Sequence, residues 1–241
     1  MSSAQEYWEK AHKAGYDDVF SLTEDEALRT RIVSELASDV QNILIPGCGS
    51  RGHLEKHIAQ AFPRAQIICT DFPKVVEIAK DKNGDIKNVE YRVCDSVSVH
   101  ELPEKFDAVI IVNAVVSGEN QENVEMVKSS LQALRAGGQL IGFFPTIFCA
   151  LDISYRASMP GIRSCIDLET STFHDPVQKE GQIFYTPLQL RQIFQAAGYQ
   201  QARIEIYYLD TPHFEAEAER LYGVDSRNTP LYQHLVLARA P

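Results

Sequence analysis

The chain has 241 residues, a length that suits one domain or a core domain with a cap, and its 44% hydrophobic and 23% charged residues are typical of a globular protein. The net charge is -10 and no basic stripe is present, so the composition excludes DNA and structured RNA as expected partners. No apolar run approaches the about 18 to 20 residues of a membrane span, and the start "MSSAQEYWEK" lacks the pattern of a secretory signal. With five cysteines and no CxxC pair, we expect a cytoplasmic protein that does not bind a membrane; its oligomeric state is left open.

Residues 1–40 are predicted to form a helical cap of two helices. The stretch "SAQEYWEKAHKAG" predicts a helix with Gly15 as its C-cap. The stretch "TEDEALRTRIVSELAS" predicts a second helix, with Thr23 as its N-cap and Glu26 three residues later.

Residues 41–145 alternate buried strands with helices. The strands are predicted at "NILIP", "AQIICTD", "VEYRVCD", "FDAVIIVN" and "GQLIGFFP", and the helices at "GHLEKHIAQAF", "PKVVEIAKDK" and "QENVEMVKSSLQALRAGG". Continuous apolar strands between helices indicate a parallel sheet covered on both faces, an α/β fold.

The regular pattern stops after Pro145 and resumes near residue 187. Residues 146–186 show no strong period, and we predict a lid or substrate insert there. Residues 187–241 then predict a helix, a strand, a short acidic helix and a last strand that closes the sheet antiparallel. The whole chain is thus expected to be a single domain.

A glycine motif follows the first strand of this alternation. Gly47, Gly49 and Gly52 form G-x-G-x-x-G where a strand turns into a helix, and Asp71 ends the next strand 19 residues later. Glycines let a ligand approach the backbone, and a carboxylate at that distance can bind both hydroxyls of an adenosine ribose. The glycines and Asp71 suit a nicotinamide dinucleotide and S-adenosylmethionine equally well. They also suit a structural turn that binds no ligand.

The later strands discriminate between these alternatives. Asp95 and Ser96 end the third strand, "FDAVIIVN" forms the fourth, and Gly-Gly precedes the fifth. This succession over about residues 40–145 resembles the class I S-adenosylmethionine-dependent methyltransferases of the small-molecule type, and "YWEKAHKAG" is similar to a helix near the start of such members. The resemblance implies a Rossmann-like, doubly wound, seven-stranded sheet that is mostly parallel with one antiparallel strand.

The resemblance also implies a cofactor site. Its residues would be Gly47, Cys48 and Gly49 against the methionine part, Asp71 at the ribose, Phe72 against the adenine, Asp95 and Ser96 at the adenine edge, and Asn113 beside the methionyl group. The chain departs from the family at Ile45, where many members carry an acid that supports the amino group of the cofactor.

Candidate catalytic residues come from both ends of the chain. Aromatic faces stabilise a sulfonium without competing as nucleophiles, so Tyr7, Trp8, Tyr155 and Tyr185 are candidates for a roof over the cofactor. His174 is a candidate general base, and Asn113 could orient an acceptor. His53, Glu55 and His57 are spaced as H-x-E-x-H. This matches neither of the helical zinc-binding motifs, H-E-x-x-H and H-x-x-E-H, so no metal site is expected.

These residues support a methyltransferase that acts on an oxygen, nitrogen or sulfur of a small-molecule metabolite. One alternative keeps the cofactor but cyclises it: a lyase that releases methylthioadenosine and a small cyclic amino acid such as azetidine-2-carboxylate. The aromatic insert and Ile45 motivate that alternative. A second alternative is a cofactor-binding partner protein without catalysis.

Overall fold

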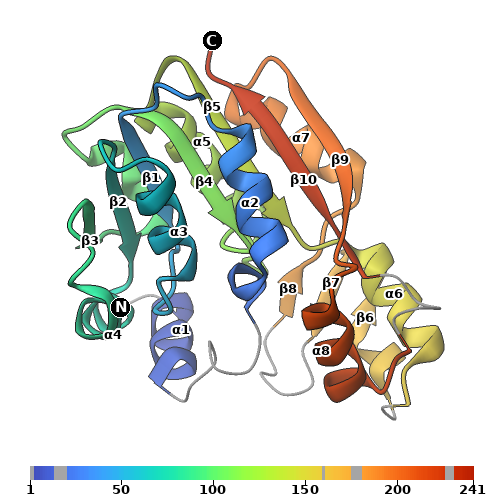
Figure 1. Ribbon diagram of the computed structural model, residues 1–241. Helices are drawn as coiled ribbons and strands as arrows, with labels where there is room; N and C mark the ends of the chain where they lie inside the picture. Colours follow the sequence, from blue (N-terminus) through green and yellow to red (C-terminus); the bar gives the residue numbers. More distant parts are fainter. Residues whose placement is uncertain (1–2, 14–20, 159–160, 175–180, 226–230) are drawn as a thin grey trace.

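The computed structural model describes residues 3–13, 21–158, 161–174, 181–225 and 231–241. Its centre is a seven-stranded sheet in the order β3-β2-β1-β4-β5-β10-β9 (Figure 1). The strands are β1 (Asn42–Pro46), β2 (Gln66–Asp71), β3 (Val89–Val93), β4 (Phe106–Val112), β5 (Leu134–Phe144), β9 (Ala202–Tyr208) and β10 (Tyr232–Arg239). β10 is antiparallel to both β5 and β9, and the other pairs are parallel. The predicted seven-stranded α/β sheet with one antiparallel strand is confirmed.

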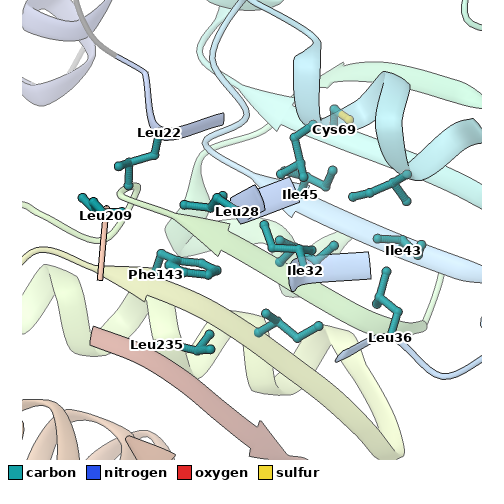
Figure 2. Packing of buried hydrophobic residues seen from close by; sticks show 14 of the residues in the cluster. Leu22, Leu28, Ile32, Leu36, Ile43, Ile45, Cys69, Phe143, Leu209 and Leu235 are labelled. Carbon is teal, nitrogen blue, oxygen red and sulfur yellow. The ribbon is translucent and has the colours of Figure 1, made fainter. Parts of the chain in front are cut away.

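Two hydrophobic clusters cover the two faces of this sheet. On one face, α2 (Glu26–Glu35), α3 (His53–Ala61) and α4 (Pro73–Asn83) pack against side chains such as Ile43 and Ile45, and α8 (Pro212–Tyr222) joins the same cluster at one end of the sheet. Figure 2 shows Leu28 and Ile32 of α2 between Ile45 of β1 and Phe143 of β5. On the other face, α5 (Asn120–Ala133) and α7 (Pro187–Ala197) pack against Leu44 and Val109. Strands buried on both faces explain why the sequence runs are continuously apolar.

The N-cap of α2 differs from the prediction. Asp25, not Thr23, caps the helix, and its Oδ1 accepts a hydrogen bond of 2.8 Å from the Leu28 N–H. Thr23 lies in a short 3₁₀ turn, η2 (Leu22–Glu24), and its hydroxyl contacts the Ser21 hydroxyl instead. The Thr211 hydroxyl donates to Asp25 Oδ2 at 2.6 Å, so a contact from a distant part of the chain helps fix this end. The proposed C-cap Gly15 lies outside the described residues.

The boundary between α5 and β5 also differs. The helix ends at Ala133, and β5 begins at Leu134, before the Gly-Gly pair that was expected to end the helix. Leu134 is buried and pairs with Phe106 across an irregularity in the ladder between β4 and β5. Strand pairing and burial therefore prevail over local helix propensity at this boundary.

The insert after β5 has regular structure of its own. It contains α6 (Ile147–Arg156), a 3₁₀ turn η4 (Ile162–Cys165), and a small antiparallel sheet of β6 (Ile166–Asp167), β7 (Thr172–His174) and β8 (Gly181–Ile183). These strands are two or three residues long, which is too short to show a period in the sequence. No helix within the described residues is long and apolar enough to cross a membrane.

Candidate functional site

The glycine loop between β1 and α3 has a left-handed backbone at all three glycines. The φ angles of Gly47, Gly49 and Gly52 are +61°, +69° and +74°, a region that favours glycine. A Cβ atom on Gly47 would lie 2.5 Å from the Ala114 Cβ and 3.9 Å from the Ser96 Oγ. The loop therefore lies directly against the residues that follow β3 and β4.

Asp71, at the end of β2, holds this loop in place. Its Oδ2 accepts a hydrogen bond from the Gly49 N–H at 2.9 Å, and its Oδ1 accepts one from the Phe72 N–H at 2.8 Å. Phe72 is the N-cap residue of α4. A carboxylate oxygen can accept further bonds beyond the one that it already accepts, so Asp71 can serve both the loop and a ribose.

The third strand brings Asp95 and Ser96 to the same edge. The Cys94 N–H donates to the Asp71 carbonyl at 3.2 Å and so joins the two strand ends. Asp95 is the N-cap of a 3₁₀ helix, η3 (Ser96–Glu101), and accepts a bond of 3.2 Å from the Val97 N–H. Ser96 faces the loop, as its distance to the Gly47 position shows.

Asn113, at the tip of β4, is in a strained conformation. Its φ is +52°, and its N–H donates to the Phe143 carbonyl at 3.0 Å, which ties the tip to β5. Its Oδ1 is buried and has no hydrogen-bond partner among the described residues. An unpaired buried acceptor costs about 1–3 kcal/mol, so this oxygen is suited to a donor from outside the chain.

The loop between β4 and α5 is clamped by α5. The Asn123 side chain is fully buried, accepts from the Ser117 N–H at 2.9 Å and donates to the Ser117 carbonyl at 2.8 Å. The Ser117 hydroxyl also donates to the Glu122 carboxylate. The sequence does not indicate these hydrogen bonds, because the partners of a buried asparagine on a helix are known only once the chain is folded.

Tyr185 lies in the core under this loop, whereas the sequence suggested a roof. It is fully buried, and its hydroxyl donates to the Val115 carbonyl at 2.8 Å. Its N–H donates to the Pro145 carbonyl at 2.8 Å, and its ring packs edge-on against Phe144. The residue thus connects the end of the insert to the loop after β4.

Of the other catalytic candidates, two lie on the insert. Tyr155 is 64% exposed, and the Arg163 guanidinium lies 4.3 Å from the centre of its ring. His174 is exposed at the end of β7, and its ring lies next to Gly181. The Gly181 carbonyl oxygen would lie 2.9 Å from a Cβ atom on Gly118, so it lies close to the loop after β4.

Tyr7 and Trp8 lie on α1 (Ser3–Lys13), with ring centroids 5.0 Å apart. This helix adjoins α4, where the Lys74 N–H donates to the Glu9 carboxylate at 3.4 Å. Figure 1 shows α1, α6, the small sheet and α8 at the same end of the central sheet.

The thiols near the loop are protonated. A hydrogen bond with Cys69 and burial raise the pKa of Cys48, and burial raises the pKa of Cys69. A protonated thiol is a poor nucleophile, so Cys48 is not suited to nucleophilic catalysis.

A hollow of about 710 Å³ lies alongside α2 and is lined by Thr30, Ser34, Tyr207 and Thr211 among others. It opens widely to solvent, and the glycine loop is not among its lining residues, so we assign the chemistry to the strand ends instead.

A glycine cradle after the first strand, a carboxylate after the second, and a seven-stranded sheet closed by one antiparallel strand define the class of Rossmann-like S-adenosylmethionine-dependent methyltransferases. The model of the O-methyltransferase domain family matches residues 2–158, and the chain belongs to that family. The chain is therefore an S-adenosylmethionine-dependent methyltransferase. The left-handed loop, the Asp71 carboxylate and the Asn113 oxygen, which has no partner among the described residues, fit such a cofactor.

Solved structures support the fold. A methyltransferase from Methanosarcina mazei is 15% identical with a TM-score of 0.62, and the match covers 87% of this chain and 96% of that one. An O-methyltransferase family protein from Burkholderia thailandensis is 13% identical (TM-score 0.59; 95% and 59% covered). Human N-acetylserotonin methyltransferase in complex with S-adenosylmethionine is 18% identical (TM-score 0.57; 88% and 51% covered). The chain thus spans only part of the last two. No curated protein matches the chain significantly.

Proposed function

We propose that this protein transfers the methyl group of S-adenosylmethionine to an oxygen of a small hydroxyl-bearing metabolite. Membership of the O-methyltransferase domain family carries this proposal, and the glycine loop against Asp71, Ser96 and Ala114 supplies a site for the cofactor. A net charge of -10 supports a small acceptor in preference to a nucleic acid.

Residues at four strand ends would each bind a different part of the cofactor. Gly47, Cys48 and Gly49 would lie along the methionine part, Asp71 would accept the ribose hydroxyls, and Phe72 would lie against the adenine. Asp95 and Ser96 would bind the adenine edge, because β3 carries both to the same edge. The unpaired Oδ1 of Asn113 would accept a hydrogen bond from the amino group of the cofactor. That bond would compensate for Ile45, where an acid is usual.

When bound, the cofactor supplies an electrophilic methyl group, and the chain holds the methyl group and the acceptor in line. Linear displacement at a sulfonium depends on alignment, which is worth several kcal/mol. Tyr7 and Trp8 on α1 would cover the cofactor, and His174 would accept the acceptor proton where the hydroxyl is weakly acidic. Tyr155 stays a predicted roof residue, while Tyr185 would act by holding the loop after β4.

We also infer that the reaction takes place in a reducing compartment, the cytoplasm, with residues 146–186 serving as the lid over the acceptor. The five cysteines are free in the structure, which supports a reducing environment.

Product analysis tests the proposal. The protein is incubated with S-adenosylmethionine alone and then with panels of hydroxyl-, amine- and thiol-bearing metabolites, and nucleosides are identified by mass spectrometry. We expect adenosylhomocysteine only when a hydroxyl acceptor is present. Methylthioadenosine without any acceptor would instead identify the cyclising lyase. Tight cofactor binding without either product would identify a non-catalytic partner.

A further inference from the structure

The strand β9 forms one edge of the central sheet, and within the described residues it pairs with β10 alone (Figure 1). Native proteins usually protect such an edge by prolines, lysines, bulges or a short strand. The seven residues of β9, ARIEIYY, include neither proline nor lysine, and their register with β10 is unbroken. Ile206 and Tyr208 on this strand are 56% and 52% exposed. The edge is therefore suited to pairing with another strand.

The hydrogen bonds of the sheet fix which backbone groups of β9 point outward. Directly after β9, the Leu209 N–H donates to the Leu231 carbonyl beside β10 at 2.8 Å. Because directions alternate along a strand, the odd-numbered residues of β9 direct their N–H and C=O groups toward β10. The even-numbered residues direct theirs away from the sheet. A strand that adds to this edge must therefore form its hydrogen bonds with the even-numbered residues.

The charges on β9 are self-complementary in one antiparallel register. Arg203 and Glu205 lie on the same face, with Arg203 Nε 2.5 Å from Glu205 Oε1. If a two-fold axis perpendicular to the sheet passes at Ile204, Arg203 of each copy lies opposite Glu205 of the other. An axis at Arg203 or at Glu205 would set like charges opposite each other, and an axis at Ile206 would leave both charges opposite uncharged residues. Opposite charges across a strand pair stabilise it, and like charges destabilise it.

We propose that β9 is the interface between two copies of this chain, which pair antiparallel about a two-fold axis at Ile204 and join their central sheets into one. A second copy is the occupant because the outward backbone groups and the charges of β9 complement themselves, as a two-fold contact requires. Glu205 Oε2 also lies 3.2 Å from the Arg31 guanidinium of α2, so its carboxylate is held on the face where Arg203 of the second copy arrives. The inference concerns assembly and does not depend on methyl transfer.

Charge-reversed variants of the full chain test this pairing by sedimentation over a micromolar concentration series. We expect the wild type to form a dimer that dissociates on dilution. Arg203→Glu and Glu205→Arg each set like charges opposite each other on both sides of the axis, so each should raise the dissociation constant at least about tenfold. An equal mixture of the two variants again sets opposite charges across the interface and should regain the wild-type affinity as a heterodimer. An effect confined to one chain cannot produce that rescue.

A control and a second readout locate the contact. Glu90→Arg makes the same change of charge on β3, the opposite edge strand, and should leave the dimer intact. Hydrogen exchange of the wild type needs no variant. The outward-pointing amides of Ile204 and Ile206 should become protected as the concentration rises, whereas the Glu205 amide, which points toward β10, should not change.

Three results would overturn the inference. One is a wild type that stays monomeric throughout the series, and another is a dimer that both β9 variants leave unaltered, because its interface lies elsewhere. The third is a mixture that fails to dimerise although circular dichroism shows both variants folded. If the variants do not fold, the exchange of the wild type decides: equal protection of Ile204 and Ile206 at low and high concentration contradicts the pairing.

Discussion

At the residue scale, Asp71 supports the glycine loop, a role that the sequence did not indicate in addition to the expected binding of the ribose. Its position after β2 suggested ribose binding, and the structure adds two backbone bonds, to the Gly49 and Phe72 N–H groups. If Asp71 also binds the ribose, as we propose, it would affect cofactor binding both directly and through the shape of the loop. Its loss would then remove a ligand contact and a support of the loop together.

We predict that Asp71→Ala weakens the binding of adenosylhomocysteine by about 1–3 kcal/mol, the usual scale for a charged hydrogen-bond partner. Calorimetry measures the change. Asp81→Ala, on the exposed face of α4, is the matched control and should leave the affinity unaltered. Equal affinities for Asp71→Ala and the wild type would contradict the assignment.

Asn113 illustrates what the sequence does not show at this scale. An asparagine after a strand suggested a contact with the cofactor or with the acceptor. The positive φ and the unpaired Oδ1 become visible only when β4, β5 and Gly47 are in place. A strained residue of this kind persists only where its surroundings fix it, and such residues gather at functional sites.

At the scale of elements, most boundaries followed from apolar periodicity, and the exceptions had tertiary causes. Asp25 replaces Thr23 as the cap of α2 because it also binds Thr211, which is remote in sequence. β5 begins at Leu134 because that residue pairs with Phe106. Neither partner is detectable from a local window. The strands of the insert were not predicted because two or three residues are too few to show a period.

The loop after β4 offers a prediction at this scale. We expect Tyr185→Phe to lower the free energy of unfolding by about 1–2 kcal/mol, because the buried Val115 carbonyl loses its donor. Tyr199→Phe is the matched control: Tyr199 is equally buried, but its hydroxyl has no partner among the described residues, so its loss should be nearly neutral.

Urea unfolding of both variants measures this difference, and acceptor kinetics show whether the loop matters for catalysis. If Tyr185 positions the loop, Tyr185→Phe should also change kcat or KM for the acceptor, while Tyr199→Phe should not. Equal stability losses in the two variants would contradict the role of the Val115 bond.

At the scale of the whole molecule, His234 makes the stability of the fold depend on pH. It is buried on β10 opposite Phe144, and its Nε2 donates to the Tyr185 carbonyl at 3.1 Å. Burial lowers its pKa, partly offset by that bond. The unfolded chain therefore binds this proton at a higher pH than the folded one does. The stability that depends on neutral His234 is complete above about pH 6.5 and is lost as the pH falls toward the folded pKa.

We predict that the free energy of unfolding of the wild type falls from pH 7 to pH 5, and that His234→Gln makes this fall shallower. Burial also lowers the pKa values of His53 and His57, so a residual slope should remain in the variant. Chemical unfolding at a series of pH values measures the slopes. Parallel curves for the two proteins would exclude His234 as the cause.

The sequence by itself determined the class of fold and the edge of the sheet at which the glycines and carboxylates gather. Buried strands are apolar, glycines and carboxylates follow them, and parallel strands place all their carboxyl ends at one edge. Those relations are local or follow from topology, so a single chain displays them.

Only the tertiary structure decided which groups share a space. It placed Tyr185 in the core instead of in a roof over the cofactor, and it left the Asn113 oxygen without a hydrogen-bond partner among the described residues. Each of these depends on contacts between residues distant in the sequence, often 20 to 70 residues apart. Such contacts form through burial and through the register between elements, so the local periodicity of the sequence does not predict them.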